Sequence, residues 1–167
     1  MIETAAQLSK QWHEGQVDKA GKPYWTHPAR VARNVQTSPG FLGLNEKDQE
    51  IAICVAYLHD VMEDCGVSAP DLIKEGFSMA TVHPVWLLSK NHGSKTIEDY
   101  CFRVRTNRIA RIVKLADLSD NCNKKREADL RALGVTIDET KYPKVLRMLH
   151  PSPKEQAWFD ESITDSA

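Results

Sequence analysis

The spacing of apolar residues most strongly constrains the fold. Through most of the 167-residue chain these residues recur about every three to four positions, which is the period of an amphipathic helix. No segment shows the run of alternating apolar and polar residues that a half-buried strand requires. Helix-capping residues stand before several of the periodic segments, such as Asn45, Ser68 and Thr96. The sequence therefore predicts an all-α protein.

The expected helices follow from these periodic and capping signals. A polar stretch from Gly15 to Thr26 separates the first two helices, Pro28 suits the first turn of the second, and a loop is expected at Pro39-Gly40. Asn45 is expected to cap a long central helix. The predicted helices cover residues 3–14, 28–38, 46–64, 69–75, 79–90, 97–105 and 108–121, and two short helices broken at Pro151 and Pro153 follow Thr140.

The length and the charge balance narrow the possible functions. A chain of 167 residues is the size of one domain, and no internal repeat or linker divides it, so we expect a single compact multi-helix bundle over residues 1–167. Its 22 basic residues are balanced by 23 acidic ones, which gives a formal net charge of -1. Proteins that bind polymeric nucleic acid usually carry a strong basic excess, so such a partner is not favoured. Any anionic ligand must be bound by local groups.

The same composition predicts a cytoplasmic protein without membrane contact. The longest apolar run, Ile51–Leu58, is far shorter than the about eighteen residues of a spanning helix. Residues Met1–Lys10 lack the basic and then apolar segments of a secretory signal. The four cysteines, at positions 54, 65, 101 and 122, lie far apart with no CxxC pair, which indicates reduced thiols.

An abrupt polar segment ends the predicted central helix. The segment His59-Asp60-Val61-Met62-Glu63-Asp64 follows directly on the apolar run. At helical spacing His59 lies beside Glu63. Asp60 likewise lies beside Asp64, so one imidazole and three carboxyl groups share a single turn. Carboxylates so close together repel one another unless they share a cation, and acidic groups at a helix C-terminus oppose the helix dipole. A metal site and a helix end that emerges into water are the two interpretations of this segment alone.

Two further segments offer candidate ligands. Asp117 interrupts the core-like pattern of the predicted helix 108–121, and Asn121 lies one turn further on the same face, although a surface Asp with a solvated Asn is the common alternative. His27 precedes Pro28 at a helix start, where a side chain can have a fixed direction. Two imidazoles and two carboxylates form a mixed set that suits Mn, Fe, Co, Zn or Ni, and the candidate ligands are His27, His59, Asp60 and Asp117.

The order of these residues carries a resemblance to a known family. The series His27, His59-Asp60 and Asp117 resembles the ligand pattern of HD-superfamily metal-dependent phosphohydrolases. Four longer runs are similar to the hydrolase domain of RelA/SpoT proteins: HEGQ at 13–16, KAGKPYWTHP at 19–28, LHDVMED at 58–64 and KLAD at 114–117. The similarity spans about residues 3–150 and leaves no length for a synthetase or regulatory domain. It implies a stand-alone small alarmone hydrolase that uses Mn²⁺ to remove pyrophosphate from the 3′ position of guanosine-3′,5′-bis(diphosphate).

The resemblance also implies roles for single residues. Mn²⁺, or another divalent transition metal, would be held by His27, His59, Asp60 and Asp117. Glu63 would orient or deprotonate the attacking water, with Asp64 assisting. Lys19, in the loop that grips the base and phosphates, and Asn121, near the nucleoside, would bind the substrate.

The loop around Lys19 departs from the family pattern. Family members usually carry Arg immediately before that lysine, whereas this chain has Asp18, and Ala20 and Lys22 replace the usual Ser and Glu. An Asp cannot supply the planar cation with which an Arg stacks on guanine. A phosphohydrolase for another nucleotide or phosphorylated metabolite is therefore an alternative. A non-catalytic nucleotide-binding module is a second alternative. The sequence argues against it, because all four implied metal ligands and both implied catalytic acids are present.

Five basic residues without an intervening acid stand between Arg103 and Lys114. Most of them are expected to lie on a solvated helix face, and the remainder could face an anionic substrate. The expected partner is a small nucleotide polyphosphate, and the oligomeric state is left open.

Overall fold

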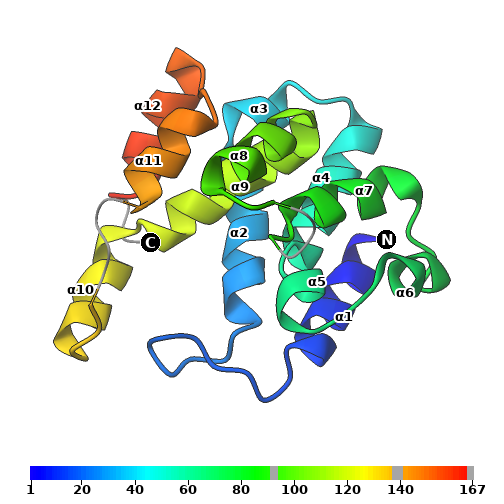
Figure 1. The fold of residues 1–167 in the computed structure, drawn as a ribbon, viewed down its shortest axis with the longest axis horizontal. Helices are drawn as coiled ribbons and strands as arrows, with labels where there is room; N and C mark the ends of the chain where they lie inside the picture. Colours follow the sequence, from blue (N-terminus) through cyan, green and yellow to red (C-terminus); the bar gives the residue numbers. More distant parts are fainter. Residues whose placement is uncertain (91–93, 137–140, 165–167) are drawn as a thin grey trace.

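The computed structural model describes residues 1–90, 94–136 and 141–164. Within these ranges the chain forms twelve helices and no β-strand, which confirms the predicted all-α class (Figure 1). One isolated bridge joins Val17 to Pro23. The helices are α1 (Ile2–Trp12), α2 (Thr26–Thr37), α3 (Pro39–Leu42), α4 (Glu46–Leu58), α5 (Val61–Asp64), α6 (Ala69–Lys74), α7 (Met79–Leu88), α8 (Ile97–Arg105), α9 (Arg108–Asn121), α10 (Lys124–Ala132), α11 (Lys141–Met148) and α12 (Pro153–Ser162).

Helices α2, α4 and α9 pack on one another at the centre of the bundle. The helices α1 and α7 pack against α4, and α7 and α8 pack against α9. Helix α9 is buried along most of its length, where Ile112, Val113 and Leu118 lie together with the acidic residues Asp117 and Asp120. Because each buried aliphatic side chain contributes roughly 1.5–3 kcal/mol, these contacts fix the position of α9 and of the acidic residues it carries.

The predicted helix starts are confirmed by their capping hydrogen bonds. Asn45 Oδ1 accepts a backbone N–H at 2.9 Å at the start of α4. Ser68 and Asp71 form a reciprocal capping box before α6, and Thr96 accepts a backbone N–H at 3.1 Å before α8. These bonds satisfy amide groups that the first turn of a helix leaves without partners. All three helices therefore begin where the sequence predicts.

The prediction of one central helix over residues 46–64 is wrong at its C-terminal end. Helix α4 ends at Leu58, and α5 begins after a two-residue turn formed by His59 and Asp60. In a continuous helix the Ala56 carbonyl would accept the backbone N–H of Asp60. The Ala56 carbonyl oxygen instead accepts a hydrogen bond from the ring Nδ1 of His59 at 2.8 Å. The His59 side chain therefore competes with the backbone N–H of Asp60 for this acceptor. The turn interrupts the predicted helix, but the backbone N–H of Asp64 still donates to the Asp60 carbonyl at 2.8 Å, so these two residues keep the helical spacing expected for them.

Two helices lie where none was predicted. Helix α3 occupies the expected loop at Pro39-Gly40 and is capped by the side chain of Ser38. It approaches α9 so closely that a Cβ at Gly40 would lie 2.8 Å from Ile112 Cγ1. Helix α10 follows Asn123, whose side chain accepts a backbone N–H of its first turn, and it lies at the edge of the bundle (Figure 1). The two tail helices α11 and α12 follow as predicted.

The state of the cysteines matches a further expectation. All four cysteines are free thiols, as predicted, and Cys54 and Cys101 are buried as small core residues. None of the helices in the described ranges is both long and apolar enough to span a membrane.

Candidate metal centre

Four polar side chains converge between α2, α4 and α9. His27 lies in the first turn of α2, His59 and Asp60 form the turn after α4, and Asp117 lies within α9. One candidate ligand atom each from His27, His59 and Asp60 lies within 4.8 Å of the others. Asp117 Oδ1 lies 3.2 Å from His27 Nε2 and 3.8 Å from His59 Nε2. All four residues predicted as metal ligands therefore form one cluster.

Hydrogen bonds outside the cluster orient the two imidazole rings. His27 Nδ1 lies 2.8 Å from Asp120 Oδ2, and Arg30 donates to both oxygens of that carboxylate, at 2.6 and 3.0 Å. His59 Nδ1 donates to the Ala56 carbonyl. Because Nδ1 of each ring faces an acceptor outside the cluster, Nε2 of each ring is directed into it. Proteins commonly orient metal-binding histidines in this way.

The surroundings of His59 Nε2 show whether the cluster suits a cation. This atom is buried and has no hydrogen-bond partner within the described residues, although Asp60 Oδ2 lies 3.0 Å away. A buried polar atom without a partner costs free energy. In a neutral ring whose proton is on Nδ1, the lone pair of Nε2 would point at the carboxylates. A divalent transition metal among them would satisfy this nitrogen, so the donor set fits such an ion.

The carboxylates give the cluster a strong preference for positive charge. Burial lowers the pKa of His27, but hydrogen bonds to Asp117 and Asp120 outweigh burial and raise this pKa to about 10. Burial also disfavours the charged form of His59, yet the Asp60 carboxylate raises its pKa. For Asp60 and Asp117, burial acts to raise the pKa, and neighbouring cationic groups hold it below the usual range. The positive charge can be supplied by protonated imidazoles or by a bound cation.

The cluster opens into a cavity of about 620 Å³, a size typical of small-molecule sites. Its lining includes the two predicted catalytic acids, Glu63 and Asp64. Lys90 holds Glu63 twice, through Nζ to Oε1 at 2.9 Å and through its backbone N–H to Oε2 at 3.0 Å. Burial and the nearby Asp60 carboxylate raise the pKa of Asp64. Asp64 therefore takes up a proton more readily than an ordinary Asp.

The two predicted substrate-binding residues, Lys19 and Asn121, also line the cavity. Asn121 Nδ2 donates to Asp117 Oδ1 at 2.6 Å, so the amide holds the orientation of a predicted ligand. Lys19 is exposed in the loop between α1 and α2, where Gly21 has a φ of 74° that few other residues adopt. The cavity thus receives side chains from the core helix α9 and from a surface loop.

Of the five basic residues between 103 and 114, Arg105 and Arg108 are exposed, and the other three are half-buried. Lys114 is the one of the five that lines the cavity within the described part of the chain, and its ammonium group pairs with Asp117. Arg103 donates to the Ser89 carbonyl at 2.7 Å, and Arg111 pairs with Glu155 at 2.8 Å. The expectation of a solvated face is wrong for these two arginines, because they hold neighbouring segments of the fold.

Sequence reasoning missed three groups that support the site. The Tyr24 hydroxyl donates to Asp60 Oδ2 at 2.7 Å, Asp120 orients His27, and Lys90 holds the predicted base. The three-residue spacing of Asp117 and Asp120 on one helix could have identified the second acid, since such residues are neighbours on the helix surface. No comparable signal marks Lys90, whose partner lies 27 residues away in the sequence.

Comparisons with known proteins point to one group of relatives. No protein-family model matches the chain. It is 33% identical over 81 residues to the GTP pyrophosphokinase of Streptomyces coelicolor and 40% identical over 65 residues to the guanosine-3′,5′-bis(diphosphate) 3′-pyrophosphohydrolase of Vibrio cholerae. These matches cover 48% and 39% of this chain. They cover 9% and 8% of the relatives, so the chain spans less than a tenth of the length of the curated proteins it matches.

One solved structure shares nearly the whole fold. It is described as a metazoan ortholog of SpoT that hydrolyzes ppGpp, and the match covers 96% of this chain and 92% of that chain, with a TM-score of 0.72 and 19% identity. At this identity the likeness establishes the fold. In this chain the shared fold brings the four candidate metal ligands into one cluster. The chain resembles the hydrolase domain of RelA/SpoT proteins, as its motifs predict.

Proposed function

We propose that this chain is a metal-dependent phosphohydrolase that releases pyrophosphate from the 3′ position of guanosine-3′,5′-bis(diphosphate). The observation that carries the proposal is the convergence of His27, His59, Asp60 and Asp117 beside a cavity that three further acidic residues and three lysines also line. A bound cation and the exposed ammonium group of Lys19 suit a polyphosphate, whose charge they offset, while Lys90 and Lys114 pair with acidic residues of the site. The names of the Vibrio relative and of the solved SpoT ortholog support the same substrate class.

The four-residue cluster would hold Mn²⁺ or another divalent transition metal. Such a cation, when bound, lowers the pKa of a coordinated water and polarises a phosphoryl oxygen. The chain's own contribution is to direct Nε2 of His27 and His59 into the cluster, which Asp120 and the Ala56 carbonyl do from outside. The ammonium group of Lys114 lies against Asp117 and offsets part of the negative charge there.

Glu63 and Asp64 would handle the protons of the reaction. Glu63, held by Lys90, would orient or deprotonate a water that bonds to phosphorus while the bond from phosphorus to the 3′ oxygen breaks. The 3′ oxygen takes up a proton, so the products are pyrophosphate and guanosine 5′-diphosphate. The raised pKa of Asp64 suits a group that assists by holding a proton.

The remaining roles concern the substrate and the setting. Lys19 would contact the phosphates or base, and Asn121 would lie beside the nucleoside. We propose that residues 1–167 work as one domain in the cytoplasm on a small nucleotide polyphosphate. The formal net charge of -1, which disfavours a polymeric nucleic acid, supports this proposal.

The acidic residue at position 18 favours a second candidate function, a phosphohydrolase with a different substrate. With an acid where related proteins carry a cation, the site could prefer another nucleotide or a phosphorylated metabolite over guanosine alarmones. The same geometry without turnover would describe a non-catalytic nucleotide-binding module.

An assay of guanosine and adenosine polyphosphates with Mn²⁺ distinguishes these candidates when pyrophosphate and orthophosphate are identified separately. We expect pyrophosphate from guanosine-3′,5′-bis(diphosphate) and none from the Asp60→Ala variant. Orthophosphate from ordinary nucleotides would support the second candidate. Binding of Mn²⁺ with no turnover of any nucleotide would support the non-catalytic module.

A further inference from the structure

Asp18, the residue that departs from the family pattern, organises the loop between α1 and α2. Its Oδ1 accepts the backbone N–H of Ala20 at 2.8 Å and that of Lys22 at 3.0 Å. Its Oδ2 accepts from Arg126 Nη1 at 2.9 Å. Burial acts to raise the pKa of Asp18, but these hydrogen bonds outweigh burial and lower it. Asp18 is therefore an ionised carboxylate that joins the loop to α10.

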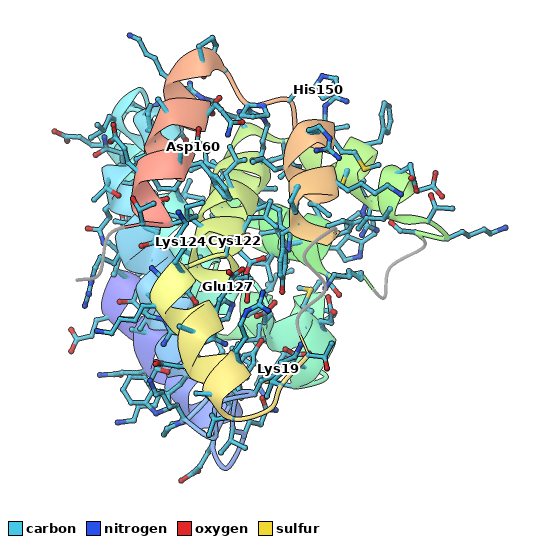
Figure 2. All side chains as sticks on the ribbon, turned by 90° about the vertical axis from the view of Figure 1, so that its left-hand side faces the viewer. Lys19, Cys122, Lys124, Glu127, His150 and Asp160 are labelled. Atoms are coloured by element: carbon cyan, nitrogen blue, oxygen red, sulfur yellow. The ribbon has the colours of Figure 1, made fainter. Side chains whose placement is uncertain are left out.

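Arg126 brings a cation to the cavity from a distant part of the sequence. It lies 108 residues after Asp18, in the first turn of α10, and its side chain lines the same cavity as the metal cluster. The side chain is 18% exposed, so the guanidinium is held at the cavity wall rather than in open solvent. Figure 2 looks onto α10 and shows Lys19, the neighbour of Asp18, next to this helix.

The two sides of the cavity differ in chemical character. Apart from Arg126, the lining that α10 and α11 contribute is largely apolar and aromatic, with Leu130, Tyr142 and Val145. Helices α2, α5 and α9 contribute histidine, acidic and lysine side chains. A nucleotide has the same two-part character, with an aromatic base and charged phosphates. The α10 side of the cavity therefore suits the base.

A guanidinium that is paired with a carboxylate keeps its planar face while much of its charge is offset. Such a face stacks well on an aromatic ring, whereas a phosphate is bound best by cations that are not already paired. We propose that Arg126 binds the nucleoside base by stacking and that Asp18 is the positioning residue that holds it. The inference rests on the proposed function in taking a nucleotide as the ligand. It explains the acid at position 18, because this acid holds an arginine that α10 supplies.

Equilibrium binding of two probes, measured by calorimetry, tests this role. The probes are guanosine 5′-diphosphate and inorganic pyrophosphate, which are products of the proposed reaction and are not consumed. Arg126→Ala is expected to weaken binding of guanosine 5′-diphosphate by about 10-fold or more, the typical loss when a stacking side chain is removed from a base. Binding of pyrophosphate is expected to be unchanged. Lys125→Ala removes an exposed charge from the same helix and is expected to change neither affinity.

Two further substitutions separate stacking from charge. Arg126→Lys keeps the positive charge and loses the planar group, so it is expected to weaken binding of guanosine 5′-diphosphate nearly as much as Arg126→Ala. Asp18→Asn keeps an oxygen for the loop amides and removes the charge that holds Arg126. It is expected to cause a smaller loss of affinity for guanosine 5′-diphosphate and none for pyrophosphate.

Three results would overturn the assignment. They are an equal loss of affinity for both probes in Arg126→Ala, full affinity for guanosine 5′-diphosphate in that variant, and no binding of guanosine 5′-diphosphate by the wild-type protein. Thermal melting establishes that each variant is folded. If the wild-type protein binds guanosine 5′-diphosphate but releases no pyrophosphate from guanosine-3′,5′-bis(diphosphate), the proposed hydrolase fails while the binding comparison still decides the role of Arg126.

Discussion

The two sides of the cavity are built from different parts of the fold. On one side His27, His59 and Asp117 are at most 4% exposed and are carried by the central helices α2, α4 and α9 or by the turn next to them. On the other side Lys19 is exposed in a surface loop, and Arg126 lies on α10 at the edge of the bundle (Figures 1 and 2). A change in the first region disturbs packing and chemistry together. In the second region the contacts are local, since Asp18 joins the loop amides and Arg126 without entering the packing of the central helices.

Asp60→Ala is expected to show the largest effect, because it removes a ligand from the buried side. The losses in Mn²⁺ affinity and in turnover should each exceed the roughly 10–100-fold that removal of an outer-sphere partner causes. Calorimetric titration with Mn²⁺ and an assay of released pyrophosphate measure the two losses. Wild-type affinity for Mn²⁺ in this variant would exclude Asp60 from the ligand set.

Glu63→Gln is expected to separate catalysis from metal binding. Turnover should fall by roughly 10²–10⁴-fold, the usual contribution of a general base, while Mn²⁺ affinity stays unchanged because Glu63 lies outside the cluster. The matched control is Lys90→Ala, which keeps the carboxylate but removes the ammonium group that holds it, and should lower turnover less. Full activity of Glu63→Gln would refute its assignment as the base.

Asp120→Asn tests whether the hydrogen bond from outside the cluster to the His27 ring supports metal binding. The substitution weakens the hold on the His27 ring and leaves Arg30 without its charged partner. Affinity for Mn²⁺ is expected to fall by roughly 10–100-fold, which is less than the loss in Asp60→Ala. If the two variants lose equal affinity, Asp120 acts as a ligand itself and the cluster has been assigned incorrectly.

Asp18→Asn is expected to have the smallest effect on the folded protein, and this effect depends on pH. The pKa of Asp18 is lower in the folded protein than its ordinary value of 3.8. Its ionised form therefore contributes stability that is present above pH 3.8 and is lost as pH falls through the lowered folded value. The variant should lower the free energy of unfolding by up to about 1 kcal/mol at neutral pH and by less in acid. Denaturant titrations at both pH values measure this difference, and a loss independent of pH would assign it to the loop hydrogen bonds instead.

The parts of the site that depend on local spacing were predictable from the sequence. The bounds of α9, the position of His27 at a helix start, and the capped starts of α4, α6 and α8 follow from periodicity and capping. The break at His59-Asp60 was not predictable, because it accompanies a bond between the His59 ring and a backbone carbonyl. The pairing of Asp18 with Arg126 was not predictable either, since the two residues lie 108 positions apart and meet only in the folded chain.

Anomalous X-ray scattering at the manganese edge, from crystals grown with Mn²⁺, tests most directly whether the cluster is a metal centre. We predict one strong peak between Nε2 of His27 and Nε2 of His59, with carboxylate oxygens of Asp60 and Asp117 as the other protein ligands. A peak at another position, or no peak at saturating Mn²⁺, would contradict this assignment.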